Sequence, residues 1–293
     1  MKSIKICFFP NVRGFILPGV FLILSALLFA SCKKENLTQP APVSTEVYSV
    51  EVVDFYNTVE KFSQYFDLNS GFTKTFSEEE LRDFARKYYL VKANDPIGYE
   101  IYGDSLHNAW TEELKANGMK PTRVEPGTIT ILLLKQIEKL YSPQFSRMID
   151  VPFFVCGKIV ARENTFYTDT TLHITLRQTN LFIQVDEIIK GNRFFKVNDT
   201  LKVIYMDHWY AFVLNPSTYF TVGRRFFFPL WYRILSDENK YELAMYYLEE
   251  ESPGGYPIEN DRILIPEDYF GLGKDLSWPE FKEYVKTNFI LDS

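Results

Sequence analysis

The sequence predicts an α+β protein, with a helical region over residues 48–148, then a small antiparallel barrel or sandwich, and a C-terminal helix. A change in the hydrophobic pattern leads to this prediction. Apolar residues recur with the period of a helix as far as about residue 148, and with the two-residue period of a strand from 151 to 266. The chain is long enough for one large domain or two small ones, each with an apolar core.

The first 31 residues have the three parts of an export signal. Lys2, Lys5 and Arg13 form a positively charged start, a run without charge follows over 15–30, and small residues precede Cys32. This arrangement resembles a bacterial lipoprotein signal. The resemblance implies cleavage after residue 31 and a lipid on Cys32. An uncleaved anchor remains open, although Pro18 interrupts the apolar run, which is shorter than a membrane span.

Residues 32–47 are expected to be a flexible tether, because they are polar and contain Pro40 and Pro42. The residues after the cysteine, Lys33–Asn36, loosely resemble the tag that directs lipoproteins of the Bacteroidota type to the cell surface. The implied location is the bacterial outer membrane. Both a periplasmic and a cell-surface orientation remain open.

Four amphipathic helices are expected in residues 48–148. Ser77 and Glu80 have the spacing of a capping box at the start of the second helix. Gly118 is expected to end the third helix, and Pro143 marks the end of the fourth. The buried stripes are Phe55, Val59, Phe62 and Phe66; Leu81, Phe84, Ala85 and Tyr88; Leu106, Ala109, Trp110 and Leu114; Leu133, Ile137, Leu140 and Tyr141. These stripes need a partner surface, either on each other or on the strands.

Strands are expected between residues 151 and 266. Turn signals separate them at Lys190–Asn192 and Ser252–Gly255, and Gly223 marks a bend or a turn. The expected strand segments are 154–160, 172–185, 201–206, 219–234, 241–248 and 258–265. A final helix begins with a second capping box, Ser277 to Glu280, and its apolar stripe (Phe281, Tyr284, Val285 and Phe289) is expected to dock on the strands.

The strand region resembles the OB-like barrels of netrin-type or metalloproteinase-inhibitor-type proteins. The resemblance covers about residues 152–290 and is carried best by Val185–Gly191 and Val222–Phe226. It implies a five- to six-stranded antiparallel OB-like barrel with a docked C-terminal helix over residues 149–293. It implies no activity, because the inhibitor family uses a free N-terminal cysteine and disulfides. Here the only cysteine of the mature domain is Cys156, which is expected to be a buried, inert thiol.

Few residues qualify for a functional site. His208, Trp209 and Tyr210 follow a strand and form the best candidate for ligand binding, whereas His107 and His173 are expected on the surface. Aromatic residues at 209–210, 226–228 and 231–232 form either a platform for sugar rings or part of the core. The familiar catalytic, metal-binding and nucleotide-binding patterns are absent from the sequence, so no catalytic residue, metal or cofactor is predicted.

The charge balance bears on partners. Without the three basic residues of the signal, the chain has 29 basic and 38 acidic residues, a net charge of −9. Nucleic acid is therefore not an expected partner. The expected partners are the membrane, through the lipid, and an envelope protein or glycan. The sequence favours a non-enzymatic binding or assembly module. The alternative is a hydrolase of envelope or dietary polymers, which would need acids such as Asp207, Glu187 and Asp261 in one cleft.

Overall fold

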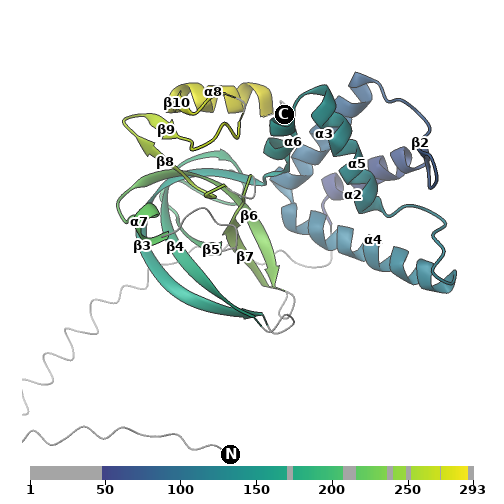
Figure 1. Ribbon diagram of the computed structural model, residues 1–293, viewed down its shortest axis with the longest axis horizontal. Coiled ribbons are helices and arrows are strands. Elements are labelled where there is room, and N and C mark those ends of the chain that lie inside the picture. Colours follow the sequence, from purple (N-terminus) through teal and green to yellow (C-terminus); the bar gives the residue numbers. More distant parts are fainter. Residues whose placement is uncertain are drawn as a thin grey trace, which may run out of the picture. The chain divides into compact units, whose positions relative to one another are not determined.

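The computed structural model describes residues 48–169, 174–206, 216–235, 240–248, 252–270 and 272–289. The α+β class is confirmed: helices form the first part of these residues, and a large sheet with a C-terminal helix forms the second (Figure 1). The signal segment, the tether and Cys32 lie outside the described residues. None of the helices in the described ranges has the length and apolar character needed to cross a bilayer.

The helices begin where the sequence supplies caps. Ser77 and Glu80 form the predicted capping box of α3, and Asp95 accepts a hydrogen bond from the Gly98 amide at the start of α4. Pro143 starts α6 as well as following α5, because proline fits the first helical position. Six helices of eight residues or more are described: α2 (Val50–Ser63), α3 (Glu78–Asn94), α4 (Pro96–Ala116), α5 (Pro126–Leu140), α6 (Pro143–Asp150) and α8 (Trp278–Phe289). A shorter helix, α7, spans Pro216–Tyr219.

The described residues contain a two-stranded hairpin and an eight-stranded sheet. The hairpin pairs β1 (Phe66–Asp67) with β2 (Gly71–Phe72). The strands of the large sheet are β3 (Phe153–Asp169), β4 (Ile174–Lys190), β5 (Thr200–Met206), β6 (Arg225–Leu235), β7 (Lys240–Met245), β8 (Tyr256–Glu259), β9 (Arg262–Leu264) and β10 (Asp275–Ser277). Their order is β10-β9-β8-β6-β3-β4-β5-β7.

Two features of this sheet differ from the prediction. It has eight strands rather than five or six, because β8, β9 and β10 continue it beyond β6. It is also mixed rather than antiparallel, because β5 pairs with β7 in parallel at Ile204 and Ala244. In addition, β6 pairs with β7 from Leu230 to Leu235, so the pairings β6-β3-β4-β5-β7 return to β6.

The hairpin of β3 and β4 is the longest paired segment of the sheet. Its register shifts around Cys156 and Gly157, which identifies bulges in the inner half of the hairpin. A Cβ atom on Gly157 would lie 2.4 Å from the Gln184 carbonyl oxygen, so only glycine allows this close approach of the two backbones. The outer half carries Phe166, whose side chain is 77% exposed. The hairpin therefore combines a buried base with an outer half that presents an aromatic ring to solvent.

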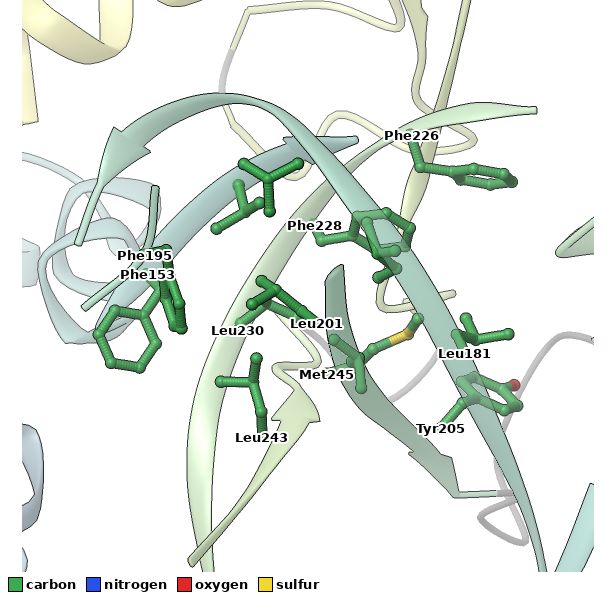
Figure 2. Packing of buried hydrophobic residues seen from close by; sticks show 14 of the residues in the cluster. Phe153, Leu181, Phe195, Leu201, Tyr205, Phe226, Phe228, Leu230, Leu243 and Met245 are labelled. Carbon is green, nitrogen blue, oxygen red and sulfur yellow. The ribbon is translucent and has the colours of Figure 1, made fainter. Parts of the chain in front are cut away.

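Residues 153–156 of β3 and 226–230 of β6 are buried on both faces of the sheet, which explains their continuous apolar sequences. Phe153 and Val155 point into the cluster shown in Figure 2, whereas Phe154 and Cys156 belong to a second cluster on the opposite face. The first cluster, the sheet interior, includes Phe153, Leu181, Leu201, Phe226, Phe228, Leu230, Leu243 and Met245. The second, the α8 core, includes Phe154, Cys156, Phe227, Tyr256, Phe270, Trp278, Phe281 and Val285. The predicted docking of the C-terminal helix is thus confirmed.

The helical region has a separate aromatic core. Phe55, Phe84 and Tyr88 pack together at its centre, and their ring centroids lie 5.5–6.2 Å apart. Its other buried members include Val59, Phe62, Leu81, Ala85, Ile129, Leu133 and Ile137. Most of the predicted helical stripes therefore face this core. The third helix differs, since α4 starts at Pro96 and its residues 104–109 are mostly exposed.

Replacing Tyr232 with phenylalanine is expected to leave stability unchanged or to raise it by about 1 kcal/mol. The Tyr232 hydroxyl is buried in the sheet interior without a hydrogen-bond partner among the described residues. Its removal therefore relieves a desolvated polar group and keeps the ring contact with Phe153. Urea unfolding of both proteins measures the difference. A clear loss of stability would mean that a buried water binds this hydroxyl.

Candidate functional site

The predicted ligand-binding residues His208, Trp209 and Tyr210 lie outside the described residues, as does His173. In the sequence, one residue, Asp207, separates them from the end of β5 at Met206. Met206 pairs with Gln178 in the outer half of the β3–β4 hairpin. Their role therefore stays a prediction.

The other aromatic candidates are mainly core residues. Phe226, Phe227 and Phe228 are fully buried, on alternating faces of β6. Trp231 is 38% exposed, and its indole N–H donates to the Met245 carbonyl oxygen at 3.1 Å. These four side chains do not form an exposed platform, because three of them are buried in packed clusters.

Two further predictions concern a histidine and a cysteine. His107 lies on the surface of α4 as predicted, and its Nδ1 is 2.8 Å from a Glu125 carboxylate oxygen. Cys156 is buried as predicted, and burial raises the pKa of its thiol to about 12. A thiol with this pKa stays protonated at neutral pH and is a poor nucleophile.

The hydrolase alternative required three acids in one cleft. Glu187 on β4 accepts hydrogen bonds from the Lys282 ammonium at 2.9 Å and from the Trp278 indole at 3.3 Å. Asp261 lies in the exposed turn between β8 and β9, and Asp207 is outside the described residues. Within the described residues, Glu187 therefore binds side chains of α8. The hydrolase alternative stays a prediction.

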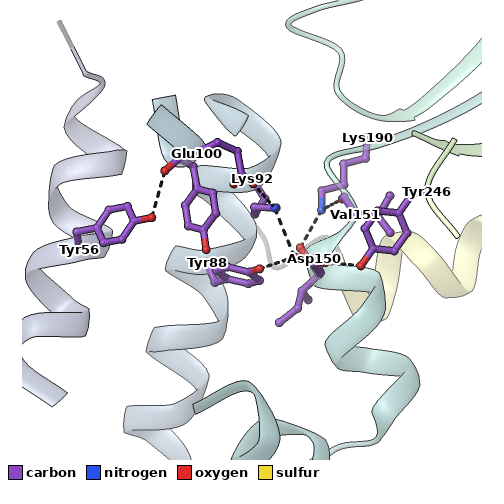
Figure 3. Close-up of polar contacts among 10 residues, drawn as sticks. Tyr56, Tyr88, Lys92, Glu100, Asp150, Val151, Lys190 and Tyr246 are labelled. Carbon is purple, nitrogen blue, oxygen red and sulfur yellow. Dashed lines mark hydrogen bonds and ion pairs between the residues drawn. The ribbon is translucent and has the colours of Figure 1, made fainter. Parts of the chain in front are cut away.

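A cluster of ionisable groups with shifted pKa values lies elsewhere, around Asp150 at the end of α6 (Figure 3). The Asp150 carboxylate accepts hydrogen bonds from the hydroxyls of Tyr88 on α3 and Tyr246 just after β7. It also lies 3.5 Å from the Lys92 ammonium. We call Asp150, Tyr88, Lys92, Lys190 and Tyr246 the Asp150 junction. Its residues come from the helices and from the sheet.

Lys92 and Asp150 form the charged pair of this junction. Burial by itself would raise the pKa of Asp150, but Lys92 and the two tyrosine hydroxyls outweigh it and hold this pKa below its ordinary value. Burial would likewise lower the pKa of Lys92, but Asp150 and Glu100 outweigh it, and the pKa of Lys92 is raised. Lys92 also contacts Glu100 on α4 at 3.2 Å. Both partners of the pair are therefore charged at neutral pH.

Lys190 at the end of β4 is placed differently. Its Nζ donates to the carbonyl oxygens of Val151 at 2.5 Å and Ile149 at 3.3 Å, and it lies 4.1 Å from the centre of the Tyr89 ring. Burial lowers the pKa of Lys190 well below its ordinary value, although Asp150 opposes this shift. The amine thus binds the carbonyls at the C-terminal end of α6 and joins this helix to the sheet.

The tyrosines of the junction act as donors. Burial, followed by the charge of Asp150, raises the pKa of Tyr88 and of Tyr246. Both hydroxyls therefore remain protonated and can donate to the carboxylate over the physiological range of pH. The junction is a set of groups that satisfy one another. This arrangement is typical of a structural network and does not require a substrate.

Sequence reasoning missed this junction. One signal was present, because Lys92 occupies the next position of the buried stripe that contains Leu81, Ala85 and Tyr88. A charged residue on a buried face needs a partner. The partner itself, Asp150, lies 58 residues further along the chain, and no local pattern connects the two.

Replacing Lys190 with methionine is expected to remove a pH dependence of stability. The folded protein binds fewer protons than the unfolded chain between the lowered pKa of Lys190 and about 10.4, so stability rises with pH in this window. The advantage of the wild type over the variant should grow by up to about 1.4 kcal/mol per pH unit. Urea unfolding at several values from neutral pH to about pH 9.5 measures it. A difference that is constant with pH would show that Lys190 stays protonated.

Comparison with known proteins finds no match to this chain among protein-family models, curated proteins or solved structures. In the described ranges, no group of three or more histidine, cysteine, aspartate or glutamate residues has the geometry to hold a metal ion.

Proposed function

We propose that this chain is a lipid-anchored protein of the bacterial outer membrane, and that its β region (β3 to α8) is a non-enzymatic binding or assembly module. The anchor part of the proposal rests on the export signal and on the small residues before Cys32. The binding part rests on the strand pairing, which is compatible with an OB-like barrel. Its orientation, toward the periplasm or the cell exterior, is left open by the proposal.

The single observation that supports the binding module best is the closed circuit of strand pairings. Strands β3 to β7 pair in the order β6-β3-β4-β5-β7-β6. A circuit of five strands around an apolar interior is the arrangement of a small closed barrel, and the interior residues in Figure 2 converge in this way. These pairings support the proposed five-stranded OB-like barrel, with β8 to β10 as an extension of its sheet.

The expected ligand face follows from the barrel. OB-folds bind oligosaccharides and oligonucleotides on the face of their second and third strands, which here are β4 and β5. The outer β3–β4 hairpin presents Phe166, and Met206, which pairs with Gln178 of this hairpin, precedes Trp209 by three residues in the sequence. Aromatic rings suit sugar rings and protein surfaces, and the net charge of −9 after signal removal disfavours nucleic acid. An envelope glycan or envelope protein is the partner that we propose.

The anchor is tested by replacing Cys32 with alanine in the full-length chain. We expect acyl chains on the wild-type Cys32 by mass spectrometry, and we expect the variant to leave the membrane fraction. If the variant stays as firmly bound as the wild type, and the wild type carries no acyl chain, the anchor is refuted.

The binding module is tested with the non-lipidated variant, profiled against envelope glycans and envelope protein extracts. A retained partner should be lost when Phe166 and Trp209 are both replaced by alanine. A matched control replaces Val222, which is also exposed but lies in the turn before β6. Failure to retain any partner would count against the module, and equal loss in the control would count against the proposed face.

A further inference from the structure

The connection between the helical region (α2 to α6) and the β region is short. Only Val151 and Pro152 separate the end of α6 from the start of β3. Apolar contact between the regions includes Ile97 of α4 in the sheet interior and Met148 of α6 in the α8 core. The Asp150 junction joins α3, α6, β4 and the segment after β7.

The junction links the two regions in both directions. Asp150 belongs to the helical region but accepts the Tyr246 hydroxyl of the β region. Lys190 belongs to the β region but donates to carbonyl oxygens on either side of Asp150. A movement of the helical region away from the sheet would therefore break contacts of both residues at once (Figure 3).

Such a movement has no favourable intermediate position. The Asp150 carboxylate and the Lys92 ammonium are mostly buried, with side chains 27% and 9% exposed. A separation of the two regions would leave Lys92 and Tyr88 on Asp150 but would remove the Tyr246 hydroxyl. It would also take the buried Lys190 amine away from its two carbonyl acceptors. A packed interface with fixed polar partners is then either closed or open.

We propose that the Asp150 junction is a conformational coupling device, which makes the helical region and the β region open and close as one cooperative unit. Asp150 binds the Tyr246 hydroxyl of the β region, and Lys190 binds the carbonyl oxygens at the end of α6. The coupling depends on the tyrosine and carboxylate hydrogen bonds rather than on the apolar contacts alone.

The test is hydrogen exchange of the full-length protein, followed by mass spectrometry of peptides from α3 and from β6. In the wild type, the slowest amides of both helix and strand should open with the same free energy. Tyr246→Phe removes one hydrogen bond to a carboxylate. It should speed exchange of α3 and of β6 by the same factor, roughly ten- to hundred-fold, because the two regions open together. Asp150→Asn should have the same pattern with a larger effect.

Tyr232→Phe is the matched control, since it removes a hydroxyl that has no partner in the described residues. It should not speed exchange in either peptide. The proposal is overturned if α3 and β6 already open with different free energies in the wild type. It is also overturned if Tyr246→Phe speeds exchange in only one of the two peptides or in neither. Should Asp150→Asn fail to fold, the comparison of the two tyrosine variants still decides the question.

Discussion

Replacing Lys92 with methionine is expected to lower the free energy of unfolding by about 3 kcal/mol. The substitution keeps most of the apolar stem but leaves the Asp150 carboxylate without the ammonium 3.5 Å away. Breaking a buried pair costs about 3–5 kcal/mol, and the lower end applies because the Asp150 side chain is 27% exposed. Urea unfolding of the full-length protein at neutral pH measures the loss.

A double variant separates the charge from the packing. Asp150→Leu added to Lys92→Met removes both charges, so it should recover part of the loss; the recovery is incomplete because Tyr88 and Tyr246 lose their acceptor. Acid provides a second check. The lowered pKa of Asp150 contributes stability above its unfolded value of about 3.9, and this contribution is lost as the pH falls through the folded pKa. The difference between wild type and Lys92→Met should shrink below about pH 4, and a constant difference would contradict the pairing.

The helices were largely predictable because their signals are local. The capping box at Ser77 and the apolar stripes fix α2, α3 and α5 within a few residues. The prediction failed at α6, because Pro143 was interpreted only as the end of a helix. Proline lacks an amide hydrogen, and the first position of a helix does not need one, so the same residue also starts the next helix.

The strands were predictable as segments, whereas their pairing was not. Alternating apolar residues identify β4 and β5, and Gly223, with a φ of 89°, does form the turn before β6. The parallel pairing of β5 with β7 has no local signal, since it depends on where the chain returns after β6. Strands β9 and β10 are three residues long, too short for any period to be recognised.

The Asp150 junction shows why a site of this kind is difficult to predict. Lys92, Asp150, Lys190 and Tyr246 are spread over 155 residues of sequence. Each is unremarkable among its neighbours in the chain, and only the fold brings them together. The predicted ligand residues His208 to Tyr210, in contrast, are adjacent in the sequence and follow a strand, so a local pattern was enough to select them. They lie outside the described residues.

Replacing Phe227 with alanine is expected to cost about 3–5 kcal/mol of unfolding free energy. The ring is fully buried in the α8 core, and its centroid lies 5.1 Å from that of Phe281, 5.5 Å from Phe154 and 5.8 Å from Trp278. Its removal leaves a cavity between β6 and α8 that rigid aromatic neighbours cannot fill by small adjustments. The measurement is urea unfolding, followed by the fluorescence of the tryptophans.

Phe166→Ala is the matched control, because this phenylalanine is also on a strand but is 77% exposed. It should change stability by no more than about 0.5 kcal/mol. The contrast tests whether α8 is part of the core or an appendage. If α8 is part of the core, Phe227→Ala lowers the free energy of unfolding of the whole protein, which still unfolds in a single cooperative transition. A small loss for Phe227→Ala, similar to that of the control, would mean that α8 covers the outer face of β6 only loosely.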